Sequence, residues 1–133
     1  MTNFVFQAHS GWRYLVILVV VLAVAKFLYG LFTGGRWTKF DQTLGMLTPI
    51  MFDVQVLLGL VLWIMGQYWS VADPTKAWEH PVTMILAVAA AHIAWTRTKR
   101  AGADQSKFQN AGYGFLVVGL LLAVGVARIT RVI

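Results

Sequence analysis

Four long runs of apolar residues alternate with three short polar stretches along the chain. The runs cover about 11–32, 43–66, 81–96 and 112–129. A helix needs about 20 mostly apolar residues to cross the hydrocarbon core of a bilayer. All four runs come close to this length, and the third is the shortest. The pattern therefore predicts four membrane-spanning helices that form a single transmembrane domain over residues 1–133.

The polar stretches between the runs are short and contain turn-forming residues. Gly34 and Gly35 lie in the first stretch, Asp73 and Pro74 lie in the second, and the third is the most polar part of the chain. Short connections place consecutive helices side by side and antiparallel. We therefore expect an all-α fold, an up-down four-helix bundle integral to the membrane.

The composition supports a membrane protein and excludes several other classes. Hydrophobic residues make up 59% of the chain and charged residues 12%, whereas a soluble domain has about 45–50% and about 25%. The absence of cysteine excludes disulfides, thiolate-bound iron–sulfur clusters, c-type heme attachment and cysteine nucleophiles. The net charge of +6 does not indicate a nucleic-acid partner, because basic residues of membrane proteins concentrate in the cytoplasmic loops.

The distribution of basic residues predicts the orientation of the bundle in the membrane. The first and third connections hold six lysines and arginines, the middle connection holds only Lys76, and the N-terminal arm holds none. Loops rich in lysine and arginine stay in the cytoplasm. We therefore expect a multi-pass protein of the inner (cytoplasmic) membrane with both termini outside.

Two ionisable residues, Lys26 and Asp53, fall inside the apolar runs, at about 9 Å and about 15 Å from the inner ends of their spans. Charged groups at such depth are costly and point to pairing or to function. Because the first two spans are antiparallel neighbours, we expect Lys26 and Asp53 to pair as a structural clasp. A proton-transfer or quinone role is one alternative. Another has Lys26 extending toward the interface, which would leave Asp53 protonated.

A second polar group is predicted at the outer end of the bundle. His9 precedes the first span and His80 precedes the third. These two spans run in the same direction, so both histidines should lie at one level, on diagonal helices. Arg13 lies one helical turn after His9, and Arg128 lies near the outer end of the fourth span.

This set suggests a heme site. Heme iron accepts two neutral imidazoles as axial ligands, here His9 and His80, and arginines suit the anionic propionates, here Arg13 and Arg128. The alternatives are a pocket for a quinol or another polar head group, or ordinary interfacial side chains. His92, near the inner end of the third span, suggests either a chlorin ligand or a hydrogen bond to a neighbouring helix.

The sequence has no GxGxxG motif for dinucleotides, no Walker motif for nucleotide phosphates and no HExxH motif of zinc-dependent hydrolases. We therefore expect a subunit that is not an enzyme on its own.

Three segments carry a family resemblance: HSGWRYLV at 9–16, QVLLGLVLWI at 55–64 and WEHPVTM at 78–84. The pattern HSxxR, QxxxG and EHP resembles that of small bacterial four-helix membrane proteins labelled cytochrome b-like. It is similar, more distantly, to a half-bundle of heme A synthase. The resemblance implies a membrane bundle that holds b-type heme, with His9 and His80 as ligands and Arg13 near a propionate.

Two functions from different classes remain open on the sequence. The first is a heme b electron-transfer component of a larger respiratory or photosynthetic complex. The second is a cofactor-free accessory subunit of such a complex. Both imply the lipid bilayer and either other membrane subunits or a second copy of the chain as partners. A transporter is a third possibility, for which four short spans would need to oligomerise.

Overall fold

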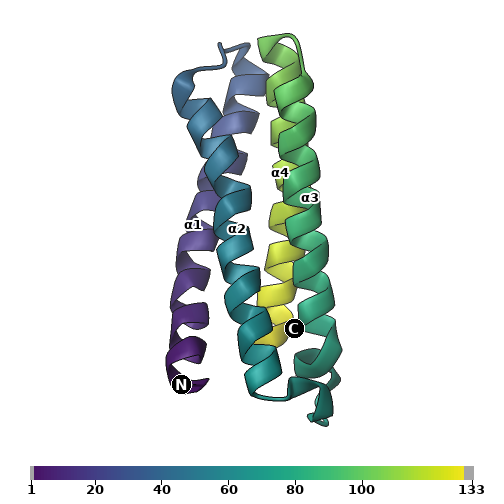
Figure 1. Cartoon of the computed structure of the whole chain (residues 1–133). Helices are drawn as coiled ribbons and strands as arrows, with labels where there is room; N and C mark the ends of the chain where they lie inside the picture. The colour runs from purple at the N-terminus through teal and green to yellow at the C-terminus, as the bar shows by residue number, and fades with distance from the viewer. Residues whose placement is uncertain (1, 131–133) are drawn as a thin grey trace.

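The computed structural model describes residues 2–130, and in this part of the chain all regular structure is helical. Four long helices run up and down: α1 (Thr2–Thr33), α2 (Lys39–Met65), α3 (His80–Arg100) and α4 (Asp104–Ile129). Figure 1 shows them antiparallel, with the two ends of the chain and the α2–α3 connection at the same end of the molecule. The predicted all-α four-helix architecture is confirmed.

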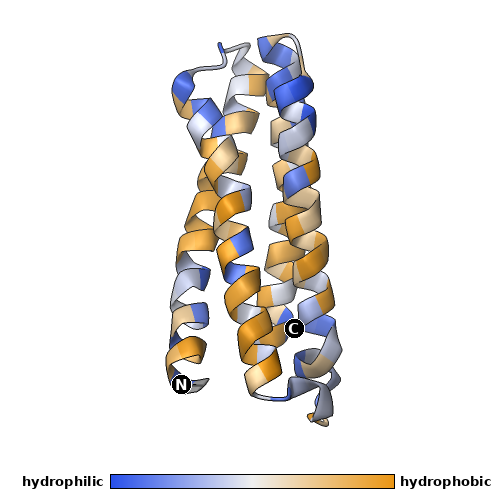
Figure 2. Cartoon of the chain, viewed as in Figure 1, coloured by the Kyte–Doolittle hydropathy of each residue, from blue (hydrophilic) through white to orange (hydrophobic). Residues whose placement is uncertain are grey.

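Three of the long helices have the length and hydropathy to cross a membrane. They are Asn3–Thr33 within α1, Lys39–Met65 and Asp104–Ile129. Helix α3 is not among them, although its 21 residues span about 31 Å. Its sequence is rich in weakly hydrophobic alanine and ends in three basic residues, which lowers its hydropathy. Figure 2 shows the apolar bands of the helices and the hydrophilic end formed by the α1–α2 and α3–α4 connections.

The second helix begins four residues earlier than the apolar run predicts, because its N-terminus is capped. The Thr38 hydroxyl accepts a hydrogen bond from the backbone N–H of Asp41, and the Asp41 carboxylate accepts one from the backbone N–H of Thr38. This capping box satisfies N–H groups that otherwise lack a partner at a helix start. The turn before it passes through Gly34, whose φ of +63° suits glycine.

The core is built from large aromatic side chains on some helices and small side chains on α3. The fully buried aromatic residues are Phe27, Phe52, Phe108 and Phe115. Opposite them, Ala87 and Ala91 of α3 are also fully buried, so α3 approaches its neighbours closely. Consecutive helices contact one another and α4 contacts α1. This leaves α1 and α3 as one diagonal pair of the bundle.

The predicted pairing of Lys26 with Asp53 is wrong. Lys26 Nζ donates to Asp41 Oδ1 at 2.7 Å, and Asp41 is fully buried. The reason is depth: Lys26 lies seven residues from the end of α1, whereas Asp53 lies fourteen residues into α2. At 1.5 Å per residue these positions differ by about 10 Å. The lysine therefore extends toward the helix end, where it meets Asp41.

Candidate functional site

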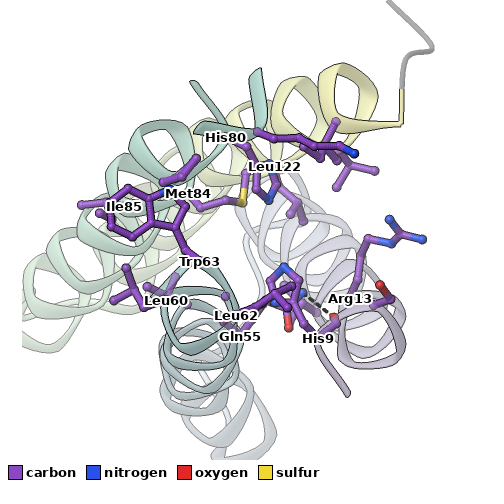
Figure 3. A pocket seen from close by; sticks show the side chains of 18 of the residues that line it. His9, Arg13, Gln55, Leu60, Leu62, Trp63, His80, Met84, Ile85 and Leu122 are labelled. Carbon is purple, nitrogen blue, oxygen red and sulfur yellow. Dashed lines mark hydrogen bonds between the residues drawn. The ribbon is translucent and has the colours of Figure 1, made fainter. Parts of the chain in front are cut away.

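A cavity of about 530 Å³ lies at the end of the bundle that holds the chain termini. This volume falls in the range of about 300–1,000 Å³ that is typical of small-molecule sites. Residues from all four long helices line it, and most are apolar, including Phe52, Met84 and Leu122. Figure 3 shows polar side chains, among them His9 and His80, directed toward this space from different helices.

The structure brings His9 of α1 and His80 of α3 together across the diagonal of the bundle. Their ring centroids are 6.3 Å apart, and the ring planes are nearly perpendicular, at 82°. In Figure 3 the two rings point toward one another. Two imidazoles that ligate one metal ion through nitrogens about 2 Å away would have centroids roughly 6–6.5 Å apart. The observed separation falls in this interval.

Hydrogen bonds to α2 fix the orientation and tautomer of His9. Its Nδ1 lies 3.2 Å from the carbonyl oxygen of Gln55, and Gln55 Nε2 donates to the carbonyl of His9 at 2.9 Å. Because a carbonyl oxygen only accepts, Nδ1 must carry the hydrogen. The lone pair of neutral His9 is therefore on Nε2. This arrangement, with Nδ1–H bonded to a backbone carbonyl, is common for imidazoles that ligate a metal.

A glycine of α2 makes room for the His9 ring. A Cβ atom at Gly59 would lie 2.9 Å from His9 Cε1, closer than carbon atoms pack, and 3.4 Å from Nδ1. Gln55 and Gly59 are one turn apart, so both face α1. One holds the histidine by hydrogen bonds and the other leaves space for its ring.

The second histidine follows a short helical segment with a wide turn. In the α2–α3 connection, η1 (Tyr68–Ser70) precedes η2 (Thr75–Glu79), and the backbone N–H of His80 bonds to the carbonyl of Thr75, five residues earlier. Such π-type turns occur frequently at functional sites. The Nδ1 atom of His80 is buried and has no hydrogen-bond partner among the described residues. A buried imidazole nitrogen without a partner needs an explanation.

The cationic residues near the cavity only partly match the predicted set. Arg13 lines the cavity, and its Nη2 donates to the hydroxyl of Tyr14 at 3.1 Å. Arg128 is outside the lining and instead pairs with Glu79, Nε to Oε1 at 2.6 Å. This ion pair joins the end of α4 to the residue before His80. Lys76, which the sequence reasoning did not select, supplies the second cation in the lining.

The sequence reasoning also missed the roles of Gln55 and Gly59, although a signal was present. Both belong to the QxxxG segment quoted for the family resemblance. The three resembling segments meet in the cavity through His9 and Arg13, Gln55 and Gly59, and His80. The spacing of four residues places Gln55 and Gly59 on one face of α2, and the resemblance links that face to the segment of His9.

The third histidine lies away from this cavity. His92 Nε2 is 2.7 Å from Asp53 Oδ1, so the predicted hydrogen bond to a neighbouring helix is confirmed and its partner is on α2. Groups of three or more histidines, cysteines or carboxylates that could hold a metal ion on their own do not occur in the described part of the chain.

Comparison of the chain with protein-family models, with curated proteins and with solved structures finds no match.

Proposed function

We propose that this chain is a small integral membrane protein that binds b-type heme between His9 and His80 and transfers electrons within a larger respiratory or photosynthetic complex. The observation that carries the proposal is the pair of imidazoles from diagonal helices, 6.3 Å apart at an apolar cavity. In the proposed arrangement all four helices cross the inner membrane, and both termini lie outside.

The donor set fits such a group. His9 has its lone pair on Nε2, because Nδ1 is engaged by the Gln55 carbonyl. His80 is half-buried, and its buried Nδ1 atom has no hydrogen-bond partner within the described chain. Gly59 leaves space beside the His9 ring that a larger residue would take. When bound, heme supplies one-electron transfer at its iron.

The remaining residues would position and enclose the group. Arg13 and Lys76 line the cavity and can form charge-assisted hydrogen bonds with carboxylates such as the propionates. Apolar side chains, including Phe52 and Leu122, exclude water from the interior of the cavity. The Glu79–Arg128 ion pair holds the start of α3 against α4. Arg128 thereby supports the position of His80.

The test is the visible spectrum of the full chain purified in detergent. We expect a Soret band and, after reduction, the sharp bands of a six-coordinate b-type heme, with one heme per chain by extraction. His9→Ala and His80→Ala should each remove this spectrum. His92→Ala is the matched control, because His92 bonds to Asp53 and does not line the cavity, and it should retain the spectrum.

Misfolding of the histidine variants can be separated from loss of a ligand. His9→Gly leaves space for free imidazole, which should restore the spectrum when it is added to the variant. A colourless protein that also fails to take up added hemin would contradict the proposal. So would an unchanged spectrum in His9→Ala and His80→Ala. Either result would favour the accessory-subunit hypothesis.

A further inference from the structure

A hydrogen-bonded pair of side chains lies halfway along the bundle, on the surface of α2 and α3. His92 Nε2 and Asp53 Oδ1 are 2.7 Å apart, and the two side chains are 51% and 50% exposed. Asp53 follows the first residue of α2 by fourteen positions and precedes the last by twelve. In the proposed membrane arrangement, the pair therefore lies at the middle of the hydrocarbon, where lipid tails offer no hydrogen bonds.

The pair has one hydrogen-bond donor and one acceptor to spare. A net charge at this depth is costly, so Asp53 and His92 together are neutral and hold a single proton between them. With that proton on His92, the ring keeps a second N–H at Nδ1, and Asp53 Oδ2 is an acceptor. With the proton on Asp53, neutral His92 accepts at Nε2 and again carries hydrogen on Nδ1, while Oδ2 is a carbonyl oxygen. Neither Nδ1 nor Oδ2 bonds to any residue of the described part of the chain.

Asp53 and His92 each belong to a stripe of exposed residues on their helix. On α2, successive members are three, four and three positions apart: Ile50, Asp53, Leu57 and Leu60. On α3, successive members are four and three positions apart: Ile85, Ala89 and His92. Alternating steps of three and four residues are the spacing with which side chains of one helix fit between those of another, and most membrane helices pack in this way. Both stripes therefore suit contact with a further helix.

We propose that two copies of this chain form a dimer through the α2–α3 face, in which His92 Nδ1 of each copy donates to Asp53 Oδ2 of the other. The face is self-complementary, because each copy presents one donor and one acceptor side by side. A two-fold axis along the membrane normal keeps every residue at its depth, so it satisfies both groups at once. The choice of a second copy rests on the membrane-spanning arrangement of the proposed function and is independent of heme.

The exchange of hydrogen bonds fixes which helices meet in the dimer. Asp53 on α2 faces His92 on α3 of the other copy, so α2 packs against that α3. Both copies have the same orientation in the membrane, and these two helices are therefore antiparallel. Leu57, four residues beyond Asp53, then comes opposite Ala89, three residues before His92. A large side chain that is 62% exposed thus meets a small one, and the polar pair sets the register of the contact.

Disulfide formation between two differently tagged copies tests this interface in native membranes, because the chain has no cysteine of its own. One copy carries Leu57→Cys and the other carries Ala89→Cys, which the proposed dimer places opposite each other. After co-expression and oxidation with copper phenanthroline, we expect a disulfide-linked pair that carries both tags.

The matched control replaces Leu57→Cys with Leu120→Cys on α4. Leu120 is 60% exposed and lies nine residues before the last residue of α4, whereas Leu57 lies eight residues before the last residue of α2. Both helices end at the same end of the bundle (Figure 1), so the two thiols are equally deep and equally accessible. Because α4 is diagonal to α2, the thiol at Leu120 faces away from the proposed interface. Its disulfide yield with Ala89→Cys should stay near background.

The role of the polar pair is tested by energy transfer between labelled copies that are diluted in lipid vesicles. Asp53→Leu removes both hydrogen bonds between the copies and should weaken dimerisation at least about tenfold. His92→Leu should weaken it similarly. Asp53→Asn removes the charge, but its amide still leaves one donor and one acceptor beside His92, so most of the affinity should remain. Circular dichroism of each variant separates loss of dimerisation from loss of helix.

Three results would overturn the proposal. An equal disulfide yield for Leu57→Cys and Leu120→Cys would indicate random collision in the membrane. A chain that stays monomeric in vesicles would show that the α2–α3 face contacts lipid or a different membrane subunit. Unchanged dimerisation of Asp53→Leu would exclude the exchanged hydrogen bonds. A colourless protein that dimerises as expected refutes the heme and leaves the interface standing, whereas a heme spectrum from a monomer refutes only the interface.

Discussion

The Lys26–Asp41 ion pair gives a quantitative test of how the end of the bundle opposite the chain termini is held together. Asp41 is fully buried, and it accepts hydrogen bonds from Lys26 Nζ at 2.7 Å and from the backbone N–H and hydroxyl of Thr38, each at 2.9 Å. Lys26→Met leaves this carboxylate without a counter-charge. Removing one partner of a buried pair costs about 3–5 kcal/mol.

For Lys26→Met we expect a smaller loss of unfolding free energy than this range. The Lys26 side chain is 34% exposed, so part of its interaction is with water, and Thr38 still donates to Asp41 after the substitution. We therefore expect Lys26→Met to lower the free energy of unfolding by about 2–3 kcal/mol. Asp41→Asn retains an acceptor oxygen for Thr38 and removes the charge. The double variant should be about 1.5 kcal/mol more stable than the sum of the two single losses.

The assay is SDS-induced unfolding of the detergent-solubilised protein, followed by helical circular dichroism. Lys26→Met combined with Asp53→Leu is the control pair, because Asp53 bonds to His92 and not to Lys26. The effects of these two substitutions should add to within about 0.5 kcal/mol. A coupling below about 0.5 kcal/mol for Lys26 with Asp41, or a larger coupling for Lys26 with Asp53, would refute the reasoning.

Two further predictions concern the histidine cavity and the orientation of the chain. Gly59→Ala should lower the free energy of unfolding by about 1 kcal/mol through crowding of His9, whereas Gly11→Ala, with open space around it, should raise it by about 0.5–1 kcal/mol; equal effects in chemical unfolding would contradict the crowding. A cysteine at Ala72 should react with an impermeant maleimide added to intact cells. One at Ser106, in the first turn of α4, should not react, since the end of the bundle at the α3–α4 connection is expected in the cytoplasm. The reverse labelling would contradict the proposed orientation.

The fold could be predicted from the sequence because each helix has its own apolar run, and short connections allow one arrangement of neighbours. The common level of His9 and His80 also follows from the sequence, because each precedes an apolar run and these two runs cross in the same direction. The depth of Asp53 does not follow from the apolar run, because that run begins near residue 43, whereas the capping box of Thr38 and Asp41 starts α2 at Lys39. Four residues move a side chain by about 6 Å along a helix, enough to change its ion-pair partner.

The rotation of each helix about its own axis was also beyond the sequence pattern. Asp53 could have faced any of its neighbours, because α2 is apolar nearly all round. This rotation depends on a contact between two helices. Trp95 of α3 is buried against Gly45 of α2, where a larger side chain would not fit. Asp53 then faces His92 on the same pair of helices. The apolar pattern of either helix alone does not predict that Trp95 packs against Gly45.

The wide turn before His80 has a consequence for insertions and deletions during evolution. The hydrogen bond from His80 to Thr75 spans one residue more than an α-helical bond. Loss of one residue within Thr75–Glu79 can convert this turn to an ordinary α-helical turn and leave the register of α3 unchanged. Loss of one residue between His80 and Met84 would instead rotate His80 by about 100° relative to the buried face of α3. In related chains, insertions and deletions should therefore occur before His80 more often than after it.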